Sequence, residues 1–149
     1  QEKAINCRVV RSCADVMPLL KIMKKNIAPS NRPDTQRQKS VGISDLDFDK
    51  QGGLVPVIAQ GVDTNAVLML AFADEAALRK TQESGFAHYW SRSRQALWKK
   101  GESSGHVQAL EVIWVDCDAD TLIYRVHQTG PACHTGQPTC FFRELRSPA

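Results

Sequence analysis

Leu54-Val-Pro-Val-Ile-Ala-Gln60 and Ala66-Val-Leu-Met-Leu-Ala-Phe72 are two apolar runs, and the stretch Gly61-Val-Asp-Thr-Asn65 separates them. Apolar, partly β-branched runs of this length, bounded by turn residues, are typical of neighbouring strands. We therefore expect a β-hairpin over residues 54–72 to organise the fold.

Further elements are expected on the C-terminal side of this hairpin. Asp74 is a typical N-cap residue, so a helix should run from there to about Glu83 and end at Gly85. Strands are expected over residues 87–91, 107–115, 121–128 and 140–145. The predicted fold class is α+β, mainly β: a compact β-rich single domain with one main helix, over roughly residues 42–146.

Residues 1–40 differ in character and are predicted to form an N-terminal extension or arm, followed by the functional domain at residues 41–149. Val16–Lys25 has a short apolar face at helical spacing, which predicts one short helix starting near Pro18. Asn26–Ser40 is polar, basic and proline-containing, as in a linker. It is either a poorly ordered extension or an arm that packs on a partner subunit.

Composition excludes several classes of protein. A length of 149 residues fits one domain, and 42% hydrophobic with 23% charged residues is an ordinary globular mixture. The formal charge of +3 is too small to indicate a nucleic-acid partner. No apolar run approaches the ~20 residues of a membrane span, and no secretory signal is visible. We therefore expect no nucleic-acid partner, no membrane and a cytoplasmic location.

The cysteines point to a metal. Their number, five, is odd, which favours metal or free thiols over a disulfide framework. Cys117, Cys133 and Cys140 offer three thiolates, which suit zinc, and a catalytic zinc typically has three protein ligands. Six residues separate Cys133 from Cys140, so a loop can bring both sulfurs to one ion, whereas Cys117 could join them within one chain or from a second subunit. The alternative is buried, inert cysteine. Cys7 and Cys13 are not expected to be ligands.

Asp116, Asp118 and Asp120 surround one of these cysteines. If the segment is extended, the three carboxylates share one face and Cys117 points to the other. Carboxylates suit Mg²⁺, although an acidic turn facing solvent is the alternative. His134 directly follows a potential zinc ligand and is the best candidate for a general base. His88, His106 and His127 fit structural roles better.

A basic segment resembles a phosphate site. Tyr89–Arg94 and Leu97–His106 combine arginine, lysine, hydroxyl and glycine residues, all of which bind phosphate, and Trp90 and Trp98 could stack on a base. The alternative is a basic surface loop with tryptophans in the core. There is no P-loop and no dinucleotide Gly-x-Gly-x-x-Gly motif.

Together these motifs resemble phosphoribosyl-AMP cyclohydrolase, a family of histidine biosynthesis. The matching segments, in family order, are Gly53–Pro56, Trp90–Arg94, Leu97–His106, Asp116–Asp120, Gly130–Gly136 and Cys140–Arg143. The resemblance implies hydrolytic opening of the adenine ring of phosphoribosyl-AMP by a zinc-activated water, giving the formimino aminoimidazole carboxamide ribonucleotide. Because the chain ends soon after Arg143, we expect this activity alone.

The resemblance also assigns the site. It implies one zinc per subunit on Cys117, Cys133 and Cys140, Mg²⁺ on Asp116, Asp118 and Asp120, and His134 as the catalytic residue. It implies an intertwined homodimer whose zinc site draws on both subunits. Residue type and position add substrate-binding candidates, namely Trp90, Ser91, Arg92, Ser93, Arg94, Lys100, Glu102, Ser103 and Ser104.

Two other readings are less compatible with the motifs. A structural zinc module usually shows a paired Cys-x-x-Cys, which this chain lacks. A zinc nucleobase deaminase shows His-x-Glu followed by Pro-Cys-x-x-Cys. The chain has Pro131-Ala-Cys133 but no cysteine three residues on. Ammonia release would distinguish a deaminase from a ring-opening enzyme.

Overall fold

Residues 40–146, the part of the chain that this computed structural model describes, contain six strands, one α-helix and two short 3-10 helices, labelled η. The predicted helix near Pro18 and both Cys7 and Cys13 lie outside the described residues. The elements are η1 (Ile43–Asp45), η2 (Asp49–Gln51), β1 (Val55–Gly61), β2 (Val67–Ala73), α2 (Glu75–Ser84), β3 (His88–Ser91), β4 (Ala96–Lys99), β5 (Gln108–Val115) and β6 (Leu122–Gln128).

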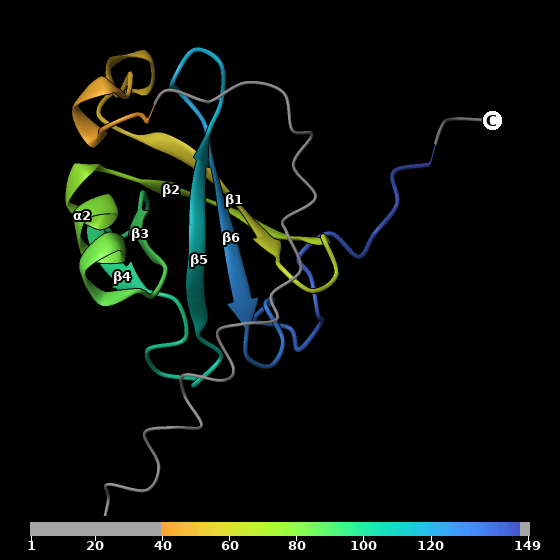
Figure 1. Cartoon of the computed structure of the whole chain (residues 1–149). Coiled ribbons are helices and arrows are strands. Elements are labelled where there is room, and N and C mark those ends of the chain that lie inside the picture. Colours follow the sequence, from red (N-terminus) through yellow and green to blue (C-terminus); the bar gives the residue numbers. More distant parts are fainter. Residues whose placement is uncertain (1–39, 147–149) are drawn as a thin grey trace, which may run out of the picture. The chain divides into compact units, whose positions relative to one another are not determined.

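The strands form one sheet in the order β4-β3-β2-β1-β6-β5 (Figure 1). β1 pairs antiparallel with β2, which confirms the predicted hairpin, and parallel with β6, where Val57 lies opposite Leu122. The parallel pair requires a long crossover, and α2, β3, β4 and β5 all belong to it. The predicted mainly β fold with one main helix is therefore confirmed.

The sheet curls towards closure beyond β5. The N–H of Ala87 donates to the carbonyl of Gln108 at 2.9 Å, and the N–H of Leu110 donates to the carbonyl of Gly85 at 2.8 Å. These bonds place the segment before β3 beside β5, on the side away from β6. The first residues of β5 thus no longer offer their backbone groups on this edge to another chain.

The core lies inside this curved sheet, under α2. Val55, Val57 and Ala59 are fully buried on alternate positions of β1, as a strand with one inward face requires. Asp74 caps the helix, because its Oδ1 accepts the N–H of Ala77 at 2.8 Å. Gly85 ends the helix in the left-handed conformation that glycine adopts without strain.

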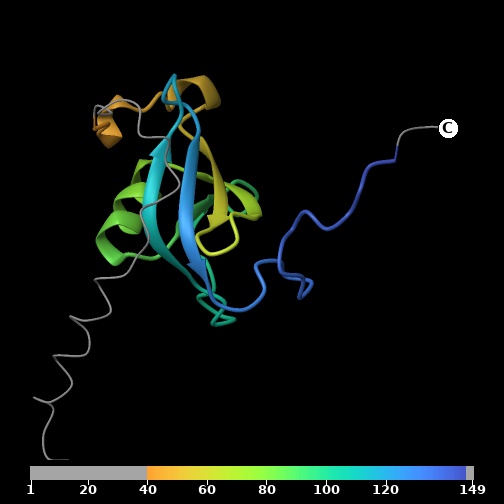
Figure 2. The ribbon, with the colours of Figure 1, turned by 45° about the vertical axis from the view of Figure 1, so that its right-hand side comes forward.

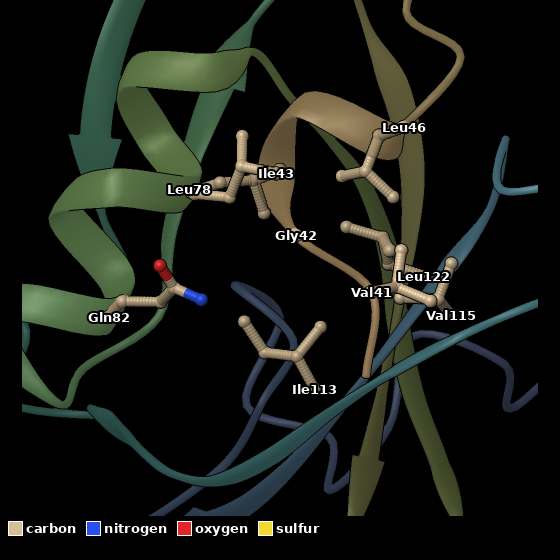
Figure 3. A pocket seen from close by; sticks show the side chains of 9 residues that line it. All are labelled: Val41, Gly42, Ile43, Leu46, Leu78, Gln82, Ile113, Val115 and Leu122. Carbon is tan, nitrogen blue, oxygen red and sulfur yellow. The ribbon is translucent and has the colours of Figure 1, made fainter. Parts of the chain in front are cut away.

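The segment that precedes β1 covers one end of this core. Figure 3 shows Ile43 and Leu46 of this segment facing Leu78 of α2 and Leu122 of β6 around a small cavity of about 40 Å³, which Gln82 also lines. A space of this size is far too small for a nucleotide, so this end of the core serves packing.

Two sequence predictions were wrong or incomplete. Residues 140–145 are not a strand, and Figures 1 and 2 show this segment leading away from the sheet as an arm. Phe141 is 60% exposed and Leu145 is 97% exposed, so the apolar residues that suggested a strand have no strand beside them within residues 40–146. β4 was missed because its short run lies among basic residues that pointed to a phosphate loop. None of the helices described here has the length and apolar content to cross a membrane.

Gly130 should tolerate a side chain less well than Gly85. Both have positive φ, 65° and 72°, so alanine costs about 1–2 kcal/mol of backbone strain at each. A Cβ on Gly130 would also lie 2.5 Å from Cδ2 of His106, whereas a Cβ on Gly85 would meet nothing within 4 Å. We expect Gly130→Ala to lower the free energy of unfolding by at least ~1 kcal/mol more than Gly85→Ala in urea titrations. Equal losses would mean that the imidazole of His106 moves aside freely.

Candidate active site

An open pocket of about 430 Å³ lies where β2, β4, the turn after β4 and the loop after β6 meet. Predicted site residues that line it are Arg94, Lys100, Glu102, Ser103, Ser104, Cys133, His134 and Cys140. Residues from four separate parts of the sequence thus border one space, which unites the predicted phosphate segment with two predicted zinc ligands.

Local backbone bonds bring the two cysteines to this pocket. The loop from Cys133 closes on itself, since the N–H of Gly136 donates to the carbonyl of Cys133 and the N–H of Cys133 donates to the carbonyl of Gln137, both at 3.1 Å. Cys140 is tied to β2 instead, because its N–H donates to the carbonyl of Leu68 at 2.8 Å. The prediction that the intervening loop folds back agrees with this geometry.

The two thiols have different electrostatic surroundings. The Sγ of Cys133 lies 3.0 Å from the hydroxyl of Thr135, and hydrogen bonds from that hydroxyl and from the Thr135 N–H lower the pKa of Cys133. Burial is the main cause that raises the pKa of Cys140. Burial also lowers the pKa of Lys100, against the opposing charges of the two thiols. Cys133 is therefore the thiol that ionises more readily, as a metal ligand must.

Cys117 lies far from these two thiols. It belongs to the turn before β6, and Cys133 follows the other end of β6. The seven residues of β6 span roughly 20 Å, whereas sulfur atoms that share one zinc ion lie within about 4 Å of each other. One chain alone does not bring the three predicted zinc ligands together, so the alternative of a site within one subunit does not fit this fold.

The aspartates do converge, but not by the predicted route. Residues 116–120 form a turn rather than an extended segment, and Ala119 has a φ of 61°. Oδ1 of Asp116 accepts the N–H groups of Asp120 and Thr121, both at 3.1 Å. The turn brings one oxygen of each of the three aspartates within 4.8 Å of the others. Such a set of carboxylates suits a hard cation such as Mg²⁺.

A lysine enters this acidic cluster of Asp116, Asp118 and Asp120. Nζ of Lys50 lies 2.8 Å from Oδ2 of Asp118 and 3.0 Å from Oδ2 of Asp120. The hydrogen bond from Lys50, followed by that from Thr121, lowers the pKa of Asp120, while the carboxylates raise the pKa of Lys50. The cluster thus attracts positive charge, and Lys50 supplies some of it from the same chain.

Four predicted substrate-binding residues lie outside the pocket. Trp90, Ser91, Arg92 and Ser93 belong to β3 and the turn that follows it. The guanidinium of Arg92 stacks on Phe72 with its carbon 3.9 Å from the ring centre. Within the described part of one chain, this segment therefore reaches the pocket through Arg94.

His106 lines the pocket, although sequence reasoning favoured a structural role for it. Its backbone passes Gly101 so closely that a Cβ there would lie 2.4 Å from the carbonyl carbon of His106. Its ring packs against Gly130 in the same way. The closely spaced glycines of 101–105 were a signal that this histidine is held at a tight turn. The pocket is also lined by Trp98, which the sequence had suggested as a stacking residue, and by four residues that were not named individually as site candidates, Met69, Lys99, Gly101 and Ala132.

Comparisons with known proteins agree with this geometry. The family model described as phosphoribosyl-AMP cyclohydrolase matches residues 69–142. A protein of that name from Archaeoglobus fulgidus is 58% identical over 101 residues, which cover 68% of this chain and 93% of the relative. The relative of that name from Streptococcus mutans is 54% identical over 103 residues, covering 69% and 94%. The relative from Desulforapulum autotrophicum is 59% identical over 102 residues, covering 68% and 82%. The chain therefore belongs to the phosphoribosyl-AMP cyclohydrolase family.

Proposed function

We propose that this enzyme opens the adenine ring of phosphoribosyl-AMP by hydrolysis, as a step of histidine biosynthesis. The observation that supports this most strongly is the high identity to relatives of that name across nearly their whole length. The family model also spans the pocket residues Cys133, His134 and Cys140. Water adds to the amidine carbon next to the substituted ring nitrogen. The bond from that carbon to the nitrogen then breaks, and the nitrogen takes up a proton.

The donor set fits zinc. Cys133 and Cys140 border the pocket, and the thiol of Cys133 is the more readily ionised. A zinc ion bound there by three thiolates would supply Lewis acidity that makes a water molecule more acidic. Thiolate ligands leave a weaker Lewis acid than neutral imidazoles do, so a base in the pocket gains importance. His134, next in sequence to Cys133, would take the proton from the attacking water.

The other pocket residues suit the nucleotide. Arg94, Lys99 and Lys100 bring positive charge for phosphate, and the hydroxyls of Ser103 and Ser104 add donors. Trp98 offers an aromatic surface for the base, and its ring is backed by Tyr89 at a centroid distance of 5.2 Å. We retain Trp90, Ser91, Arg92, Ser93 and Glu102 as further candidates for substrate contact.

We propose that the working form is an intertwined homodimer. Since Cys117 lies at the opposite end of β6 from Cys133, the partner's Cys117 would have to complete each zinc site. The partner's acidic cluster, which belongs to the same turn as its Cys117, would then lie near the basic pocket. Opposite charges at these two surfaces favour that arrangement.

An apolar row on the outer face of the sheet supports the dimer. The row consists of Leu70 of β2, Ile58 of β1 and Ile123 of β6, which lie opposite one another in register. Leu70 is 49% exposed, and the arm beyond Cys140 carries two further exposed phenylalanines. Continuous apolar surface of this kind is usually covered by a partner.

Ring opening is the first activity to measure. Metal-replete protein incubated with phosphoribosyl-AMP should change the ultraviolet absorbance of the base without releasing ammonia, and zinc chelation should abolish the change. Cys133→Ser should lose both zinc and turnover. Ammonia release would indicate a deaminase, and full turnover by metal-free protein would exclude the zinc chemistry.

Mixed dimers test whether the zinc site is shared. Cys117→Ser and Cys133→Ser should each be inactive alone. A dimer with one chain of each kind keeps one complete site, so random mixing after co-refolding should restore about a quarter of the wild-type sites. Each variant refolded alone is the control. A mixture that stays inactive although mixed dimers form would contradict the shared site.

Lys50 should compete with a divalent cation for the acidic cluster. Removing its charge from beside Asp118 and Asp120 leaves the carboxylates free for the ion. Lys50→Met should therefore raise the affinity for Mn²⁺, a paramagnetic substitute for Mg²⁺, severalfold in binding titrations followed by electron paramagnetic resonance. Lys80→Met, which removes a lysine of α2 paired with Glu83, is the matched control. Unchanged or weaker Mn²⁺ binding by Lys50→Met would show that Lys50 does not occupy the ion's place.

A further inference from the structure

A series of three hydrogen bonds starts at the buried Tyr89 and ends at Thr129, in the loop that leads from β6 to the pocket. The hydroxyl of Tyr89 donates to Oε1 of Gln108 at 2.6 Å, and Nε2 of Gln108 donates to Oε1 of Gln128 at 2.9 Å. Nε2 of Gln128 then donates to the carbonyl of Thr129 at 2.9 Å. Tyr89 and Gln108 are fully buried. Ring opening as derived above uses none of these side chains.

The carbonyl of Thr129, the last acceptor, determines the donor-to-acceptor direction of every hydrogen bond in the series. A carbonyl oxygen cannot donate, so Gln128 must present its NH₂ group to Thr129 and its Oε1 to Gln108. Gln108 must then donate to Gln128, which leaves its own oxygen for the phenol of Tyr89. Burial raises the pKa of Tyr89 well above its ordinary value, so the phenol keeps the proton that it donates. Every bond is thus satisfied in one orientation only.

Gln128 joins the two segments that carry the pocket residues. Its Nε2 donates to the carbonyl of Thr129 and also lies 3.5 Å from the carbonyl of His106. The N–H of Thr129 donates to the carbonyl of Val107 at 2.9 Å, and the ring of His106 packs against Gly130. Cys133 follows this junction by three residues. A shift of the Thr129 carbonyl would therefore move both His106 and Cys133.

We propose that Gln108 and Gln128 are positioning residues, which hold the Thr129–Gly130 turn so that Cys133 meets the metal in the geometry that catalysis needs. The proposal rests on the proposed zinc site. Hydrogen bonds one step behind a metal ligand commonly change metal affinity or activity by about 10–100-fold when removed. Hydrogen bonds that begin at two fully buried side chains and are satisfied in a single orientation suit such a role, because no other arrangement satisfies the same groups.

Matched variants can separate positioning from simple stability. Gln128→Met keeps the length of the side chain and removes its hydrogen bonds. Tyr89→Phe removes only the first donor. Tyr124→Phe is the control, since its ring is buried 5.6 Å from that of Tyr89, but its hydroxyl takes no part in the series of hydrogen bonds from Tyr89 to Thr129. Each protein is loaded with Co²⁺ in place of zinc, and its absorption spectrum, kcat and KM are measured with its thermal midpoint.

We expect Gln128→Met to alter the cobalt–thiolate bands and to lower kcat by roughly tenfold or more with little change in KM. Tyr89→Phe should change the cobalt–thiolate bands and kcat in the same direction, but by less. It therefore still tests the proposal if Gln128→Met fails to fold. Tyr124→Phe should leave the spectrum and kcat unchanged. If the variants lose thermal stability but keep the wild-type spectrum and kcat, the positioning role is wrong, while the proposed zinc site is unaffected. A wild-type protein without cobalt–thiolate bands would overturn the zinc site and this proposal together.

Discussion

The arrangement of the whole domain depends on β1, which pairs with two strands of opposite direction. Its antiparallel neighbour β2 follows it directly, whereas its parallel neighbour β6 is the last strand within residues 40–146. A parallel pair cannot be joined by a tight turn, so every element from α2 to β5 lies within the crossover. The buried alternate residues of β1 then form the floor on which that crossover packs.

This pairing also decides where the functional groups lie. Because β6 runs parallel to β1, the acidic turn before β6 meets the segment before β1, and the N–H of Asp47 donates to the carbonyl of Ala119 there. The cysteine loop after β6 meets the start of β2 at the opposite end. The separation of Cys117 from Cys133 is therefore a property of the sheet itself, and it is the strongest structural argument for a site built from two chains.

The sequence predicted local structure well and long-range structure poorly. The hairpin at residues 54–72, the cap at Asp74 and most strand limits follow from local patterns and agree with the structure. No local sequence pattern indicated the parallel pairing of β1 with β6, because the two strands are far apart in the sequence. Phe141 and Phe142 suggested a strand because an apolar run has the same sequence pattern in a strand and in an exposed arm. The aspartates of the acidic cluster converge through a left-handed Ala119, which no spacing rule indicated. Tyr89 and Gln108 were not recognised because their roles depend on contacts between distant residues.

The late arrival of β6 has a consequence for synthesis of the protein. Leu122 leaves the ribosome about 65 residues after Val57, its neighbour in the finished sheet. At roughly 5–20 residues per second, β1 and β2 would remain a nascent hairpin with one unpaired apolar edge for several seconds. Contacts between residues so far apart in sequence form slowly. Charged residues that flank β1, such as Asp49, Lys50 and Asp63, oppose aggregation of this exposed edge until β6 is made.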